Sequence, residues 1–136
     1  MGFMSQQHKI YLGNTMAILW GGIIAAGLAN FSFYFGAMLM FSDEHIPKAQ
    51  LFISGVILFF GPITSSFTGG YITARTGINK EKLIATLSGI IPLIVLLGGM
   101  DLDFGILLTH IHITLSLLLI IPCAWLGGHV YTKYRF

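Results

Sequence analysis

Uncharged and mostly apolar residues form four long stretches, and every charged residue lies in the short polar segments between them or at the two ends of the chain. The stretches are residues 10–42, 49–74, 83–100 and 104–132. Each is close to or longer than the ~20 residues that a helix needs to cross ~30 Å of hydrocarbon. The pattern predicts an all-α, membrane-embedded four-helix bundle that forms a single transmembrane domain over residues 1–136. We expect helices at about 14–41, 50–75, 80–100 and 104–132.

Polar residues next to these stretches suggest where the helices begin. Asn14, Asn79 and Asp103 are all residue types that cap helix N-termini, and Glu81 suits the first turn of the third helix. The third stretch is the shortest and contains Pro92. We therefore expect Asn14 to cap the first helix, Asn79 the third and Asp103 the fourth.

The basic residues predict the orientation in the membrane. Lys48 stands alone among the basic residues on one side, where four of the five acidic residues also fall. Basic residues concentrate in cytoplasmic segments, so the opposite side is expected to be cytoplasmic. Both termini are then inside a cell membrane, inner or plasma. The residues on the cytoplasmic side are Lys9, Arg75, Lys80, Lys82, Lys133 and Arg135.

Composition narrows the functional classes. The chain is 55% hydrophobic and only 9% charged, which is outside the range of ordinary soluble domains and makes the lipid bilayer its first partner. A net charge of +2 without a basic, aromatic-rich patch gives no reason to expect nucleic acid as a partner. Cys123 is the one cysteine, so no disulfide forms within the chain.

Two helix ends resemble each other. Gly69-Gly70-Tyr71, followed by Arg75, matches Gly127-Gly128-His129, followed by Lys133, at a constant separation of 58 residues. We favour a parallel repeat of two helical hairpins, related by a two-fold axis along the membrane normal, over coincidence.

The segment from Gly69 through Arg75 and Gly77 to a polar loop and an apolar helix with Gly89 carries a family resemblance. It resembles small four-helix prokaryotic integral membrane proteins of unknown function. The resemblance covers about the middle third of the chain. It implies the topology and no activity.

Small residues recur every fourth position in the first two helices. Gly61, Ser65 and Gly69 share one face of the second helix, and a similar row is expected on the first helix. Such faces let two helix backbones approach closely in a membrane. We therefore predict them to be packing surfaces. The row on the first helix is Gly22, Ala26 and Asn30.

The second helix also carries a run of hydroxyl side chains after Pro62. Pro62 leaves one backbone carbonyl without its usual donor, and these hydroxyls are close enough in sequence to donate a hydrogen bond there. A structural role in helix packing is therefore the favoured interpretation. The alternative is a polar seam for a solute or water. The seam residues are Thr64, Ser65, Ser66 and Thr68.

One polar cluster on the outer side is a candidate metal site. Asp103 precedes His110 by seven residues, so a helix places both on nearly the same face. Carboxylate and neutral imidazole together suit zinc, copper or iron. His112 points away from His110 on a helix, so the two cannot chelate one ion while the helix is intact. The alternative is that Asp103 only caps the helix and that His110 forms a hydrogen bond with a neighbouring helix.

No stretch contains Asp, Glu, Lys or Arg, and no nucleophile or phosphate-binding motif is present, so we expect no enzyme activity. The leading hypothesis is an accessory or structural subunit of a larger membrane complex, packing against other integral membrane subunits or itself. The alternative is a homo-oligomeric channel or facilitator lined by the hydroxyl seam. Metal handling at Asp103 and His110 is the third hypothesis.

Overall fold

The computed structural model describes residues 2–40, 47–99 and 111–134. Every regular element in those residues is a helix. Four helical stretches are long and apolar enough to cross a membrane: 6–39, 48–76, 81–99 and 111–133. The predicted all-helical class is therefore confirmed, as is the prediction of four helices long and apolar enough to cross a membrane. The helices are α1 (Gly2–Met40), α2 (Lys48–Thr76), α3 (Glu81–Ser88), α4 (Ile90–Gly99) and α6 (Ile111–Lys133).

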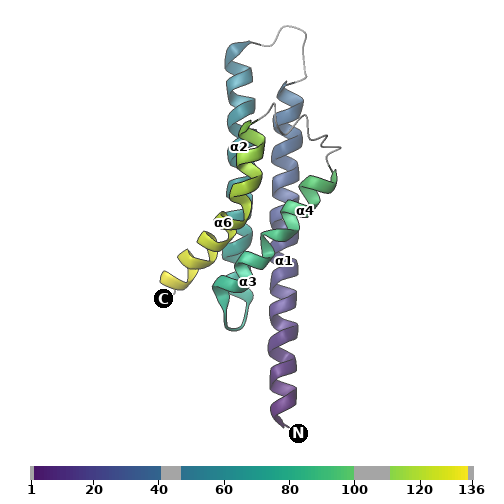
Figure 1. Ribbon diagram of the computed structural model, residues 1–136, viewed down its shortest axis with the longest axis vertical. Helices are drawn as coiled ribbons and strands as arrows, with labels where there is room; N and C mark the ends of the chain where they lie inside the picture. The colour runs from purple at the N-terminus through teal and green to yellow at the C-terminus, as the bar shows by residue number, and fades with distance from the viewer. Residues whose placement is uncertain (1, 41–46, 100–110, 135–136) are drawn as a thin grey trace.

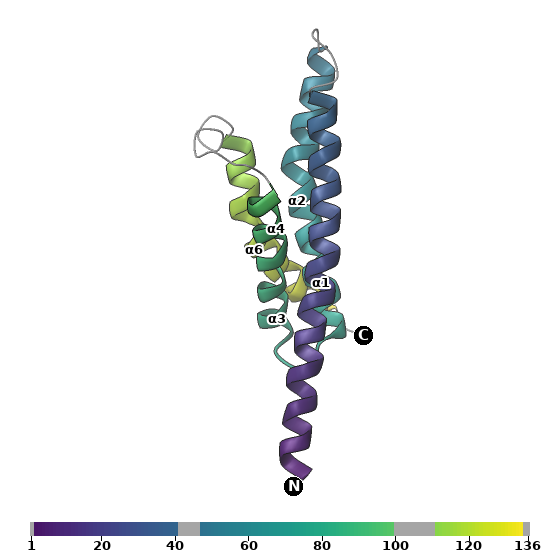
Figure 2. The same ribbon diagram turned by 90° about the vertical axis from the view of Figure 1, so that its right-hand side faces the viewer.

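The bundle is organised around α2, which packs against α1 on one side and α6 on another. Figure 1 shows these helices with α3 and α4 completing the bundle. The start of α1, the turn between α2 and α3 and the end of α6 all lie toward one end of the molecule (Figure 1). Figure 2 shows α1 and α2 running side by side while α3, α4 and α6 group together next to them.

Helix α1 is longer than the sequence predicts. It starts at Gly2 and runs 39 residues, which is about 58 Å at about 1.5 Å per residue. Its first turns extend beyond the rest of the bundle (Figures 1 and 2). Asn14 therefore lies inside the helix, and the expectation that it caps α1 is wrong. Its side chain instead accepts a hydrogen bond from the turn after α2, at a distance of 2.7 Å from the Ile78 nitrogen.

The third span is a helix in two parts. α3 ends at Ser88, and α4 begins at Ile90. Gly89 at the junction lies against α6, where an added Cβ would come within 2.8 Å of the Ala124 Cβ. Pro92 adds to the break because it has no amide hydrogen to offer the carbonyl of Ser88.

The N-cap of α3 is Lys80 rather than the predicted Asn79. Both residues have a positive φ, 64° for Asn79 and 55° for Lys80, so the chain reverses through two left-handed residues before the helix starts. The Lys80 side chain makes no capping hydrogen bond. The backbone turn itself sets the start of α3.

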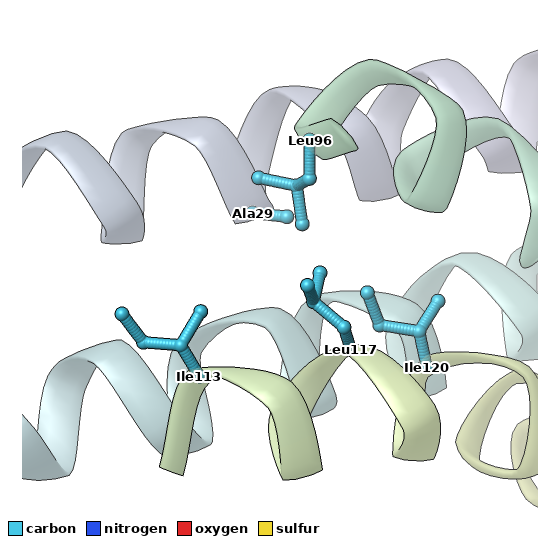
Figure 3. Packing of buried hydrophobic residues seen from close by; sticks show 5 residues of the cluster. All are labelled: Ala29, Leu96, Ile113, Leu117 and Ile120. Carbon is cyan, nitrogen blue, oxygen red and sulfur yellow. The ribbon is translucent and has the colours of Figure 1, made fainter. Parts of the chain in front are cut away.

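The interior of the bundle is built largely from small side chains. Among the described residues, seven of the thirteen buried hydrophobic ones are alanine, so the helix backbones approach more closely than leucine-rich cores allow. A larger cluster fills the space where α1, α4 and α6 meet. In Figure 3 Leu96 lies next to Ala29, and three side chains of α6 point toward them from the other side. Those three are Ile113, Leu117 and Ile120.

Candidate functional site

The small-residue face of α2 lies against α1. An added Cβ on Gly69 would come within 2.6 Å of the Gly21 carbonyl oxygen and 2.5 Å of the Ala25 Cβ. One on Gly61 would come within 2.9 Å of the Ser32 hydroxyl oxygen. Ser65 lies between the two glycines on this face and is buried. The three residues singled out from the sequence thus share one helix–helix contact.

The corresponding residues of α1 divide between neighbours. Gly22 lies against Ile91 of α4, not against α2. Ala26 is buried and Asn30 is half-buried, and a partner for the Asn30 amide stays a prediction. The contact with α2 uses Gly21 and Ala25, one position earlier, which the sequence interpretation missed. The sequence does contain a signal for this second contact, in the pairs of small residues at 21–22 and 25–26. Adjacent small residues that repeat every fourth position form two parallel rows on a helix, and each row can meet a different neighbour.

Both glycine doublets sit where a helix has two neighbours. Consecutive residues point about 100° apart on a helix, so a doublet can bring two backbones close in different directions. Gly69 faces α1, while an added Cβ on Gly70 would meet the backbone of Ala124 in α6. An added Cβ on Gly127 would lie 2.9 Å from the Tyr71 nitrogen of α2, and one on Gly128 would lie 2.5 Å from the Ala85 Cβ of α3.

The neighbours of the two doublets differ in one respect. Gly69, the first glycine of its pair, contacts the other helix of its own hairpin, whereas Gly127 contacts the opposite hairpin. A two-fold axis between hairpins would give both first glycines the same kind of neighbour. The contacts therefore lend the parallel repeat no support, and it stays a prediction.

The hydroxyl seam does not form a single face. Thr64 and Thr68 are exposed on the outside of α2, and each donates a hydrogen bond back to its own helix, at 2.9 Å to the Phe60 carbonyl and 2.8 Å to the Thr64 carbonyl. Ser65 is buried and donates to the Gly61 carbonyl at 2.6 Å. Ser66 is fully buried, and its hydroxyl has no hydrogen-bond partner among the described residues.

Other hydroxyls, outside the predicted seam, are also buried in the bundle. Ser116 of α6 is 1% exposed and donates a hydrogen bond across to the Phe59 carbonyl of α2 at 3.1 Å. Thr73 is fully buried and bonds the Gly69 carbonyl at 2.8 Å, beside Gly21. The buried serines outside the seam stand singly within apolar stretches, so no helical periodicity in the sequence marks them as buried. In the part of the chain that the structure describes, the remaining buried hydroxyls are those of Ser54 and Ser88.

The predicted metal ligands Asp103 and His110 lie outside the described residues, so the proposed pair stays a prediction. Within the described part of the chain, no group of three or more His, Cys, Asp or Glu side chains is placed to hold a metal ion. His112 is half-buried in a shallow groove between α2 and α6, whose other lining residues include Leu51, Phe52 and Phe59.

Aromatic side chains gather where α2 and α6 end. The rings of Tyr71 and Tyr131 meet edge to face with centroids 5.6 Å apart. Trp125 stacks on His129, one turn further along α6, with centroids 5.2 Å apart. Rings of this type prefer the level of lipid headgroups, so the cluster suits one membrane surface.

A polar cleft lies at the same end of the molecule, between α1 and the turn that follows α2. Its volume is about 220 Å³. The hydrogen bond from Ile78 to Asn14 joins its two walls, and Ile78 packs against Gly13. The lining residues are Gln7, Ile10, Tyr11, Asn14, Asn79 and Lys80.

Comparison of this chain with protein-family models, curated proteins and solved structures gave no match. Function is therefore argued from the chain's own geometry.

Proposed function

We propose that this chain is an accessory, structural subunit of a larger integral membrane complex. The observation that carries the proposal is the close backbone contact of α2 with α1 at Gly69 and with α6 at Gly70. At these two positions the helix backbones leave no room for a solute between them. The surface that remains for function is the outside of the helices.

That outer surface favours membrane and protein contacts over chemistry. Large apolar side chains cover α1, with Tyr11, Phe31 and Met38 each more than 70% exposed. A helix that is apolar on its outer side can face lipid or another subunit equally well. A scaffold role needs only this surface.

The proposed membrane is the cell membrane, inner or plasma, with both termini cytoplasmic. The support is the clustering of basic residues at the end that holds the start of α1, the α2–α3 turn and the end of α6. The parallel repeat of two hairpins is kept as part of the proposal, and it rests on the matching sequence of the two helix ends alone.

Native mass spectrometry on the tagged chain, extracted from its own membrane in mild detergent, tests the subunit role. We expect the chain to be recovered with larger, unrelated membrane subunits at a fixed stoichiometry. A chain recovered alone, at a concentration where a known complex from the same extract stays intact, would contradict the proposal.

One observation favours the second candidate, a homo-oligomeric channel or facilitator. Thr64 and Thr68 are exposed one turn apart on the outside of α2, where several copies could turn them toward a shared pore. A clean homo-oligomer in the same experiment supports this candidate. Thr64→Val and Thr68→Val should then reduce solute flux in vesicles, while Phe67→Leu on the same exposed side serves as the control.

A further inference from the structure

Five of the six residues that line the cleft between α1 and the α2–α3 turn carry polar groups, and the sixth is the apolar Ile10. Gln7, Asn79 and Asn14 carry amides, Tyr11 carries a hydroxyl and Lys80 an ammonium group, all of which can donate hydrogen bonds. None of the lining residues is acidic. A group that fits this set of donors is an anion.

The hydrogen bond to Asn14 fixes which part of its amide the cleft can use. The Ile78 backbone nitrogen is a donor, so the atom that it meets at 2.7 Å is the Asn14 oxygen. The amide NH₂ group is then the part that remains for a ligand. Because this bond also joins the two walls, Asn14 both holds the cleft together and supplies it with a donor.

The position of the cleft suits a headgroup. It lies beside the turn that follows α2, and the last turn of α2 contains the basic residue Arg75. On the predicted orientation this is the cytoplasmic membrane surface, where anionic lipids attract basic residues. Glu81 follows Lys80 in the sequence and carries a carboxylate, but it lies in the first turn of α3 and does not line the cleft. At about 220 Å³ the cleft is smaller than the ~300–1,000 Å³ typical of pockets for drug-sized ligands.

We propose that this cleft binds a phosphate group, carried by an anionic phospholipid headgroup or present as a free phosphate. Lys80 supplies the charge, and the Asn14 and Asn79 amides supply the directed donors. The site is independent of the subunit role proposed above, because it needs only this chain.

Two substitutions test the site in the purified full-length protein. Lys80→Gln removes the charge while keeping a long polar side chain. Asn14→Asp keeps an oxygen for the Ile78 amide but replaces the NH₂ donor with a negative charge. Hydrogen bonds to charged groups contribute enough that we expect each variant to bind phosphatidylglycerol about tenfold more weakly than wild type does, as measured by native mass spectrometry.

Lys82→Gln is the matched control, since Lys82 is exposed, lies two residues away and does not line the cleft. It should bind phosphatidylglycerol as wild type does, and all proteins should bind phosphatidylcholine equally. Equal losses in Lys80→Gln and Lys82→Gln would mean that only general surface charge attracts the lipid, and would overturn the proposal. Unchanged binding in both cleft variants would overturn it as well.

The source of the phosphate is decided by competition. Inorganic phosphate and glycerol 3-phosphate are added to the protein with phosphatidylglycerol bound. Displacement by either soluble compound in wild type, absent in Lys80→Gln, identifies a site for free phosphate. Retention of the lipid, with the sensitivity to Lys80→Gln described above, identifies a site for the lipid headgroup.

Discussion

Gly21 of α1 and Gly69 of α2 meet backbone to backbone, and the contact is reciprocal. A Cβ added to either residue would lie 2.6 Å from the carbonyl oxygen of the other. Real Cβ atoms do not approach an oxygen so closely, and neither backbone can move aside without shifting its whole helix. The pair therefore sets how closely α1 and α2 pack.

The first prediction is that Gly69→Leu separates α1 from α2. The larger side chain overpacks a contact with no free space, at a cost of roughly 1–3 kcal/mol or more. Thermal unfolding in detergent should show a lowered midpoint. Gly55→Ala is the control on the same helix, because a Cβ at Gly55 meets nothing within 4 Å. A Gly69→Leu protein as stable as Gly55→Ala would show that the two helices do not rely on this contact.

The second prediction concerns the bond from Ser116 to the Phe59 carbonyl. Ser116→Ala should lower stability by about 0.6 kcal/mol, the typical size of a hydrogen bond between membrane helices. Ser88→Ala is a suitable comparison, because that hydroxyl is equally buried but bonds the Ala85 carbonyl of its own helix. We expect the larger loss from Ser116→Ala in equilibrium unfolding. The reverse order would argue against a stabilising bond between α2 and α6.

The third prediction is the orientation. Single cysteines at Thr76 and Ala49, both exposed and near opposite ends of α2, are introduced in a Cys123→Ala background. A membrane-impermeant thiol reagent added to intact cells should label position 49 and leave position 76 unlabelled. The opposite pattern would place both termini outside.

The fourth prediction tests the outer cluster. If Asp103 and His110 bind a metal, elemental analysis of the gently purified protein should find it, and both Asp103→Asn and His110→Ala should lose it. Acidification should release the metal, because imidazole must be unprotonated to act as a ligand. Stoichiometric metal that survives His110→Ala would exclude this histidine from the site.

The sequence predicts the spans well because burial in lipid imposes a strong and local requirement on composition. It also indicates which face of α2 is small. It does not reveal that Asn14 binds the turn at Ile78, since the two residues are 64 positions apart and neither shows a pattern alone. Asn14 is a good capping residue, but helix formation simply continues through the preceding segment to Gly2.

The choice between neighbouring rows of small residues is likewise a tertiary effect. On α1 the rows beginning at Gly21 and Gly22 look alike in sequence, and only the placement of α2 and α4 decides which row each helix meets. The seam at Thr64–Thr68 failed as a single surface for a related reason. At about 100° per residue, these four hydroxyls spread over about 200° around the helix, so they cannot all face one neighbour.

The alanine-rich interior also limits which substitutions this sequence can accept. Ala29, Ala85 and Ala124 have no exposed surface, so a change there is acceptable only when volume stays almost constant, as with glycine or serine. On the lipid side, residues such as Leu118 and Ile94 exchange for other apolar types of any shape. Homologues of this protein should therefore conserve side-chain volume at the buried positions and only hydrophobicity at the outer ones.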